Sequence, residues 1–158
     1  MADAARQVGV GIHARNNLFR SAFHVALLFE GNDITIERNE FKHVVQETFD
    51  AGAVYTGRDL TYRGNAVRDN FFHHIGRPGA ACNNYTNCVN MAVYVDDSAG
   101  GLEVTGNIMW SLQNGFYANH GADNTISNNL FLDVSMPAIT TTQCYCDYFG
   151  GNNATIYK

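Results

Sequence analysis

Hydrophobic and polar residues alternate along this chain in short segments that turn residues separate from one another. Short alternating runs of this kind predict half-buried β-strands rather than helices. One segment recurs: an apolar residue, two variable residues, an Asn, a variable residue, and a Phe or Met. The Asn residues of this motif are Asn17, Asn39, Asn70, Asn107 and Asn129, with spacings of 22, 31, 37 and 22. The shorter spacing predicts one coil of a repeat, and the longer spacings predict a coil with an insertion.

A second short strand follows each copy of the motif and opens with a small residue. The segments are ALLFEG from Ala26, AVYTGR from Ala53, AVYVDD from Ala92, GFYANH from Gly115 and AITTTQ from Ala138. One such unit cannot bury its apolar side alone, so the units must stack and pair their strands. We predict an all-β fold, a parallel β-helix (solenoid) of about five coils with stacked Asn side chains. An antiparallel sandwich is disfavoured, because no hairpin signals separate the strands.

Composition supports one folded domain over residues 1–158, with a loop insertion at about 76–90 and a C-terminal tail at about 144–158. Hydrophobic residues make up 46% of the chain and charged residues 16%, which is a globular composition. The formal charge of −5 and the lack of a Lys/Arg cluster argue against nucleic acid. No apolar run approaches the roughly 20 residues of a membrane span, and the start has no signal-peptide pattern. We therefore expect no membrane partner.

Cysteine usage points to an oxidising compartment. The cysteines are Cys82 and Cys88 in CNNYTNC, and Cys144 and Cys146 in CYC. Four cysteines in polar segments favour one or two disulfides, although four free thiols are the alternative. Their spacing is not that of a recognised zinc site. Sequons at Asn84 and Asn153 are compatible with secretion, so we expect a secreted, extracellular protein.

Four segments resemble the right-handed parallel β-helix proteins of the pectate-lyase-like superfamily. They are GNDITIERNEFKHV, DAGAVYTGRDLTYRGNAVRDNFFHHI, AVYVDD and GADNTISNNLFLDV, and the resemblance covers roughly residues 8–143. They are similar to secreted β-helix repeat proteins linked with polysaccharide degradation. The resemblance implies right-handed coils and a polysaccharide partner. It implies no single reaction, because this solenoid supports lyases, hydrolases, epimerases and proteins with no assigned reaction.

Aligning the second strands predicts one face that carries tyrosines and polar groups. Its first outward row is Leu28, Tyr55, Tyr94, Tyr117 and Thr140. The next row is Glu30, Gly57, Asp96, Asn119 and Thr142, and the following turn carries Arg58, Asp97 and His120. Tyr rings pack against sugar rings, and carboxylates and amides orient a bound chain. We predict that Tyr55, Asp96, Asp97, Asn119 and Glu30 bind polysaccharide. A Tyr ladder that only stabilises the sheet is the alternative.

Two reactions are compatible with this face if the protein is an enzyme. A lyase or epimerase of acidic polysaccharide removes the proton α to a uronate carboxylate. The candidate catalytic residues for that reaction are Tyr94, Tyr117, His120 and Arg58. A hydrolase would instead use two carboxylates, Asp96 or Asp97 with Glu30. Glu47 and Asp50, in the insertion before AVYTGR, can add acidity near the rim of the face.

We expect no cofactor and no metal ligands. Asp96 and Asp97 could hold Ca²⁺, although a solvated turn is the favoured interpretation. His43 and His74 fall at equivalent positions of neighbouring coils, where a stack could bind a metal but a surface pair is favoured. Trp110 is expected on an outer side. The alternative to a carbohydrate-active domain is a structural solenoid that associates head to tail into filaments without catalysis.

Overall fold

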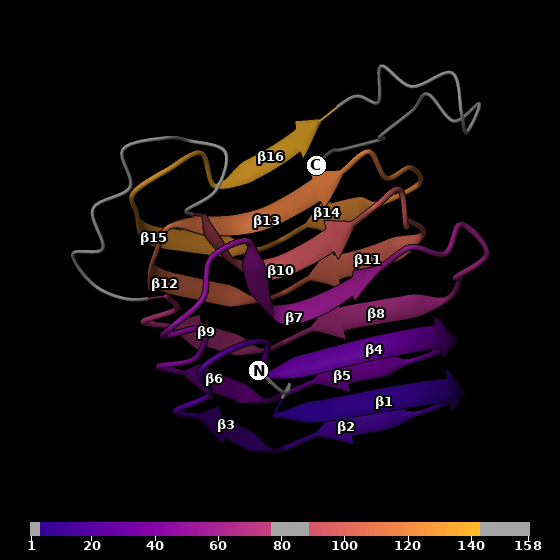
Figure 1. Cartoon of the computed structure of the whole chain (residues 1–158), viewed down its shortest axis with the longest axis horizontal. Helices are drawn as coiled ribbons and strands as arrows, with labels where there is room; N and C mark the ends of the chain where they lie inside the picture. The colour runs from indigo at the N-terminus through magenta and orange to yellow at the C-terminus, as the bar shows by residue number, and fades with distance from the viewer. Residues whose placement is uncertain (1–3, 77–88, 143–158) are drawn as a thin grey trace.

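The computed structural model describes residues 4–76 and 89–142, which form three parallel sheets wound into one stack of coils (Figure 1). Sheet A contains β1 (Ala5–Val10), β4 (Leu27–Asn32), β7 (Ala51–Gly57), β10 (Asn90–Asp96), β13 (Asn114–Asn119) and β16 (Ile139–Thr142). Sheet B contains β2 (His13–Arg15), β5 (Thr35–Glu37), β8 (Asn65–Arg68), β11 (Leu102–Thr105) and β14 (Thr125–Ser127). Sheet C contains β3 (Leu18–Arg20), β6 (Glu40–Lys42), β9 (Phe71–His73), β12 (Ile108–Leu112) and β15 (Leu130–Val134).

Each of the coils that begin at β1, β4, β7, β10 and β13 contributes one strand to each sheet, and β16 adds a further strand to sheet A. The paired strands are parallel, as predicted for a β-helix. Sheets B and C have the five strands expected of about five coils, whereas sheet A has six. The additional strand, β1, was not predicted. Its Gln7 is the register partner of Phe29, so a polar residue occupies the inward position that carries an apolar residue in the next coil. The hydrophobic pattern is therefore absent from this strand.

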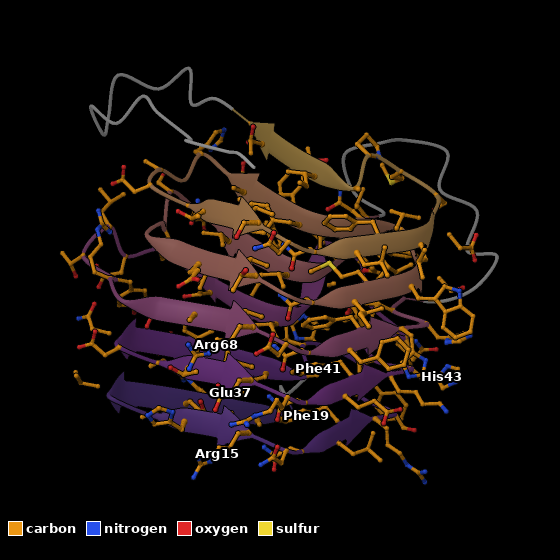
Figure 2. All side chains as sticks on the ribbon, turned by 180° about the vertical axis from the view of Figure 1, so that it is seen from behind. Arg15, Phe19, Glu37, Phe41, His43 and Arg68 are labelled. Carbon is orange, nitrogen blue, oxygen red and sulfur yellow. The ribbon has the colours of Figure 1, made fainter. Side chains whose placement is uncertain are left out.

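The core between the sheets is built from columns of equivalent residues. Phe19, Phe41 and Phe72 stack with ring centroids 4.7 Å apart along the axis, and Figure 2 shows two of these rings in line. Register continues the column through Met109 and Phe131. Phe41, Phe72 and Met109 are fully buried. The column places large apolar side chains on one another at about the strand spacing, so each ring packs against the next inside the coil.

The predicted Asn stack is confirmed as a continuous ladder of hydrogen bonds. The Nδ2 of Asn17, Asn39, Asn70 and Asn107 each donates to Oδ1 of the next ladder Asn, at 3.1, 3.0, 3.0 and 2.9 Å. A residue in the left-handed conformation stands immediately before each ladder Asn. The residues with positive φ there are Asn16, Arg38, Asp69, Gly106 and Asn128. The ladder Asn then satisfies backbone groups that the bend between sheets B and C leaves unpaired.

Several predictions fall outside the described residues. Most of the loop insertion at about 76–90, with Cys82, Cys88 and the sequon at Asn84, lies there, as does the tail at about 144–158 with Cys144, Cys146 and Asn153. The disulfide prediction therefore stays a prediction. The described part of the chain contains no helix that is long and apolar enough to span a membrane.

Candidate functional site

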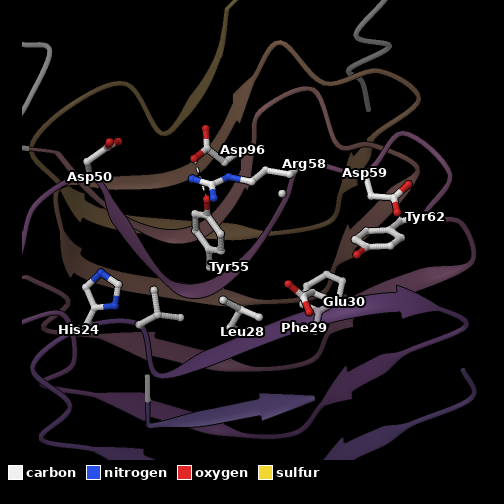
Figure 3. Close-up of a pocket in the computed structure, with 12 residues that line it drawn as sticks. His24, Leu28, Phe29, Glu30, Asp50, Tyr55, Arg58, Asp59, Tyr62 and Asp96 are labelled. Atoms are coloured by element: carbon white, nitrogen blue, oxygen red, sulfur yellow. Dashed lines mark hydrogen bonds between the residues drawn. The ribbon is translucent and has the colours of Figure 1, made fainter. Parts of the chain in front are cut away.

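A groove of about 520 Å³ opens on the outer face of sheet A, beside β4, β7 and the loop that follows β7 (Figure 3). Its origin is a local separation of two strands. Over the described residues, β4 and β7 pair through Leu27 with Val54 and Leu28 with Tyr55. Beyond this point β4 continues beside β1, whereas β7 leads into the inserted loop 58–64. Glu30 and Gly57, expected as neighbours in one row, both line the groove but are not among the register pairs of β4 and β7.

The Asp96 carboxylate is the most densely hydrogen-bonded group in this groove. Its Oδ2 accepts a 2.7 Å hydrogen bond from the Tyr55 hydroxyl. Its Oδ1 accepts hydrogen bonds from the Tyr94 hydroxyl and Asn119 Nδ2, both at 2.9 Å, and from the Asp97 backbone N–H at 2.8 Å. Burial alone would raise the pKa of Asp96, but the donors outweigh it and lower the pKa below its usual value. Asp96 is therefore a fixed anion at neutral pH.

Tyr94 connects this anion to a second carboxylate. Its hydroxyl oxygen lies 2.9 Å from Oδ1 of Asp96 and 3.1 Å from Oδ1 of Asp50. Asp50 stands just before β7 with φ of 56° and is exposed, and both carboxylates line the groove. One hydroxyl proton serves a single acceptor at a time, so the two carboxylates share the Tyr94 hydroxyl as their donor.

The predicted tyrosine row is confirmed as a row, but its members are not equally open. Tyr94 is the register partner of Tyr55 and Tyr117, and both neighbouring rings meet it edge-on at 5.3 Å. Only 3% of Tyr94 is exposed, so its ring offers no stacking platform. Burial and the nearby carboxylates raise the pKa of Tyr55 and of Tyr94 well above the ordinary value. Both hydroxyls therefore remain protonated donors.

The other predicted residues lie around this network. Arg58 Nε donates to Asp97 Oδ2 at 2.9 Å, and both side chains are exposed. Glu30 accepts a 2.6 Å hydrogen bond from Arg6 on β1. Tyr117 and His120 belong to β13 and the turn after it, and neither lines the groove. Hydrogen bonds among the described residues thus form one network, and these bonds leave Glu30, Tyr117 and His120 outside it. Its members are Tyr55, Tyr94, Asp96, Asn119, Asp97 and Arg58.

Sequence reasoning gave little weight to two residues that line the groove. Asp50 was placed only near the rim, and Tyr62, in the loop after β7, was not considered. The signal that would have found them is coil length. The 31-residue coil from Asn39 to Asn70 exceeds the 22-residue coil before it, and its additional residues lie on either side of β7.

A second polar cluster lies on the outer face of sheet C. His73 is buried, its Nε2 is 3.0 Å from Oε1 of Glu40, and its Nδ1 is 2.8 Å from Nδ1 of His74. The expected pair of His43 and His74 is confirmed as a ring contact, with centroids 5.0 Å apart. Trp110 is 41% exposed, as expected for an outer side, and its ring meets His74 edge-on at 5.0 Å. Burial and then the neighbouring His73, His43 and Lys42 lower the pKa of His74.

Three parallel sheets in successive coils, joined by an Asn ladder, define the class of the protein as a parallel β-helix. A family model described as the right handed beta helix region matches residues 5–156, and the chain belongs to this family. The comparisons with curated proteins and with solved structures return no match. The family description states a fold and no reaction.

Proposed function

We propose that the groove on sheet A binds a glycan chain and that Asp50 and Asp96 act on it as the carboxylate pair of a glycoside hydrolase. The observation that carries the proposal is the shared Tyr94 hydroxyl. It lies 3.1 Å from Oδ1 of Asp50 and 2.9 Å from Oδ1 of Asp96, so these two oxygens are at most 6.0 Å apart. Carboxyl groups about 5–5.5 Å apart serve retaining glycosidases, and groups about 6.5–9.5 Å apart serve inverting ones.

The two carboxylates differ in a way that suits two roles. Asp96 is held ionised by four hydrogen-bond donors, so it can stabilise the positive charge that develops on the sugar ring. Asp50 is exposed at the groove and shares one hydroxyl proton with Asp96. It is the member that can give a proton to the leaving oxygen and recover it from water.

The charge of the groove favours a neutral or amino sugar over the acidic polysaccharide expected from sequence. Four carboxylates, those of Glu30, Asp50, Asp59 and Asp96, line it, and Arg58 is the guanidinium group among its lining residues. A uronate chain would meet this excess of negative charge, which weakens its binding. Tyr55 and Tyr62 supply the aromatic surface against which sugar rings pack.

Lyase or epimerase chemistry fits the groove less well. Such a reaction needs a base beside the proton α to a carboxylate. Burial and carboxylates raise the pKa of Tyr94 and Tyr55, so neither phenol is ionised at neutral pH. Of the other predicted bases, Tyr117 and His120 do not line the groove, and Arg58 lines it, but its hydrogen bond to Asp97 raises the pKa of Arg58 further, so it stays protonated. The tyrosines are therefore assigned as hydrogen-bond donors that position Asp96.

A panel of neutral, amino-sugar and uronate oligosaccharides tests the proposal. Calorimetry measures binding, new reducing ends measure hydrolysis, and ultraviolet absorbance of unsaturated products measures elimination. Asp50→Asn should retain binding and lower hydrolysis by about 100-fold or more, and Asp96→Asn should lower it as well. Asp133→Asn, an exposed substitution on β15, is the matched control. Absence of binding to every glycan, or unsaturated products from the wild-type protein, would contradict the proposal.

A further inference from the structure

The outer edge of sheet C brings together three imidazoles that have no part in the groove. His73 ends β9 and His74 follows it, whereas His43 occupies the equivalent turn of the preceding coil. Both turn residues adopt the left-handed conformation, with φ of 49° for His43 and 55° for His74. This shared backbone conformation directs their side chains to the same side of the stack, one coil apart, and Figure 2 shows His43 at that edge.

The contacts of His73 leave one nitrogen of His74 available to a ligand. The Nε2 of His73 lies 3.0 Å from Oε1 of Glu40, and its Nδ1 lies 2.8 Å from Nδ1 of His74. The Nδ1 of His74 is therefore engaged with His73, and its Nε2 is the nitrogen that can face a metal ion. A carboxylate acting through a hydrogen-bonded chain in this way orients metal-binding histidines in proteins.

His43 completes the arrangement from the neighbouring coil. Its ring centroid is 5.0 Å from that of His74, with 42° between the ring planes. The side chain is exposed, and no described residue forms a hydrogen bond with its ring. The Nε2 of His74 and a nitrogen of His43 are thus two imidazole nitrogens one coil apart on the same edge. Among the described residues, no group of three or more His, Cys, Asp or Glu could hold a metal ion, so any ion here would keep several water ligands.

We propose that His43 and His74 form a two-imidazole site for a divalent transition-metal ion, with Glu40 and His73 as the residues that position it. Imidazole ligands suit Cu²⁺, Ni²⁺ and Zn²⁺ rather than Ca²⁺ or Mg²⁺, and Cu²⁺ binds tightest of these. Lys42, the register partner of His73, adds a positive charge that opposes any cation, whereas Glu40 and Asp133, whose charge also reaches His74, add negative charge. The two nitrogen ligands therefore determine which ion binds. The site is independent of the proposed glycan groove.

Trp110 provides a direct measurement, because it is the only tryptophan of the chain and its ring is 5.0 Å from that of His74. Cu²⁺ titrated into the intact protein should quench this fluorescence in a saturable manner, and Ni²⁺ should bind more weakly at the same site. His43→Asn and His74→Asn should each weaken Cu²⁺ binding about tenfold or more, since one of two protein ligands is lost. Asn is chosen because it tolerates the left-handed backbone of both positions.

His13→Asn is the matched control, since His13 is exposed on β2 in a different sheet; it should leave the titration unchanged. Circular dichroism establishes that the variants fold. Electron paramagnetic resonance of the Cu²⁺ complex should report two coordinated imidazole nitrogens in the wild type and one in each variant. Wild-type quenching midpoints in both His43→Asn and His74→Asn, or no saturable quenching in the wild type, would overturn the proposal.

Discussion

Asn70 lies in the middle of the Asn ladder, and its replacement by Ala should destabilise the protein far more than the same change at the end of the ladder. Only 2% of Asn70 is exposed. Its Oδ1 accepts the backbone N–H and the Nδ2 of Asn39, at 2.9 and 3.0 Å. Its Nδ2 donates to the carbonyls of Ile36 and Arg68 and to Oδ1 of Asn107, at 2.9, 3.0 and 3.0 Å.

The magnitude follows from the groups that lose a partner. A neutral hydrogen bond contributes about 1 kcal/mol net, and a buried donor left unsatisfied costs about 1–3 kcal/mol. Asn70→Ala leaves the buried N–H of Asn39 without its acceptor and removes the interactions on the other side. We expect a loss of about 3–5 kcal/mol, a large part of the stability of a typical domain. Asn17 is exposed and its side chain donates one hydrogen bond, to Asn39 at 3.1 Å, so Asn17→Ala should cost about 1 kcal/mol or less.

Urea denaturation followed by far-ultraviolet circular dichroism and by Trp110 fluorescence measures both free energies of unfolding. Coincident curves from the two probes establish that the coils unfold together, which a repeat protein need not do. The difference between Asn70→Ala and Asn17→Ala should be about 2 kcal/mol or more. An equal loss at the two positions would refute the idea that the ladder stabilises the stack by satisfying buried backbone groups.

Three further predictions concern acid sensitivity, the core and assembly. The hydrogen bond from Arg38, opposed by burial and assisted by Arg68, lowers the pKa of Glu37. The ionised Glu37 therefore stabilises the folded protein at pH values above its unfolded pKa of about 4.3, and this stabilisation is lost as the pH falls through its lower pKa in the folded state. Glu37→Gln should accordingly make the urea midpoint less dependent on pH on the acid side. Phe72→Ala should cost about 3–5 kcal/mol in urea denaturation, and more than Phe19→Ala at the half-buried end of the column. Sedimentation velocity tests head-to-tail association, and a monomer at every concentration would contradict it.

The repeat was predictable because each coil must satisfy the same physical requirements at the same positions. An inward Phe or Met and a ladder Asn recur in each of the five motif copies, and both periodicities are visible in the sequence. The register that aligns Tyr55, Tyr94 and Tyr117 follows from that alignment. β1 escaped prediction since Gln7 stands where Phe29 stands in the next coil. Among the described residues β1 pairs with β4 alone, so its inward residue has fewer apolar neighbours to pack against.

The candidate site was only partly predictable, because it depends on loops that follow no period. The row positions of Tyr55, Asp96 and Asn119 come from the repeat, and their mutual hydrogen bonds are what parallel stacking produces. Asp50 meets Tyr94 from an insertion whose path the sequence does not specify. Burial also differs along the row: Tyr94 is enclosed while Tyr55 lines the groove. Alternation assigns a side chain to the outer face and says nothing of what covers it.

The Asn ladder holds the coils together, and the inserted loops carry groove residues. A site can therefore arise on this fold at little cost in stability. The ladder Asn residues hold the strands in register whether the coil between them contains 22 or 31 residues. The entropy of closing a loop grows only logarithmically with its length, so lengthening a coil from 22 to 31 residues costs about 0.3 kcal/mol. One ladder hydrogen bond of about 1 kcal/mol exceeds that cost. Asp50, Arg58 and Tyr62, which line the groove, all lie on the longer coil, where substitution and insertion leave the Phe column and the ladder undisturbed.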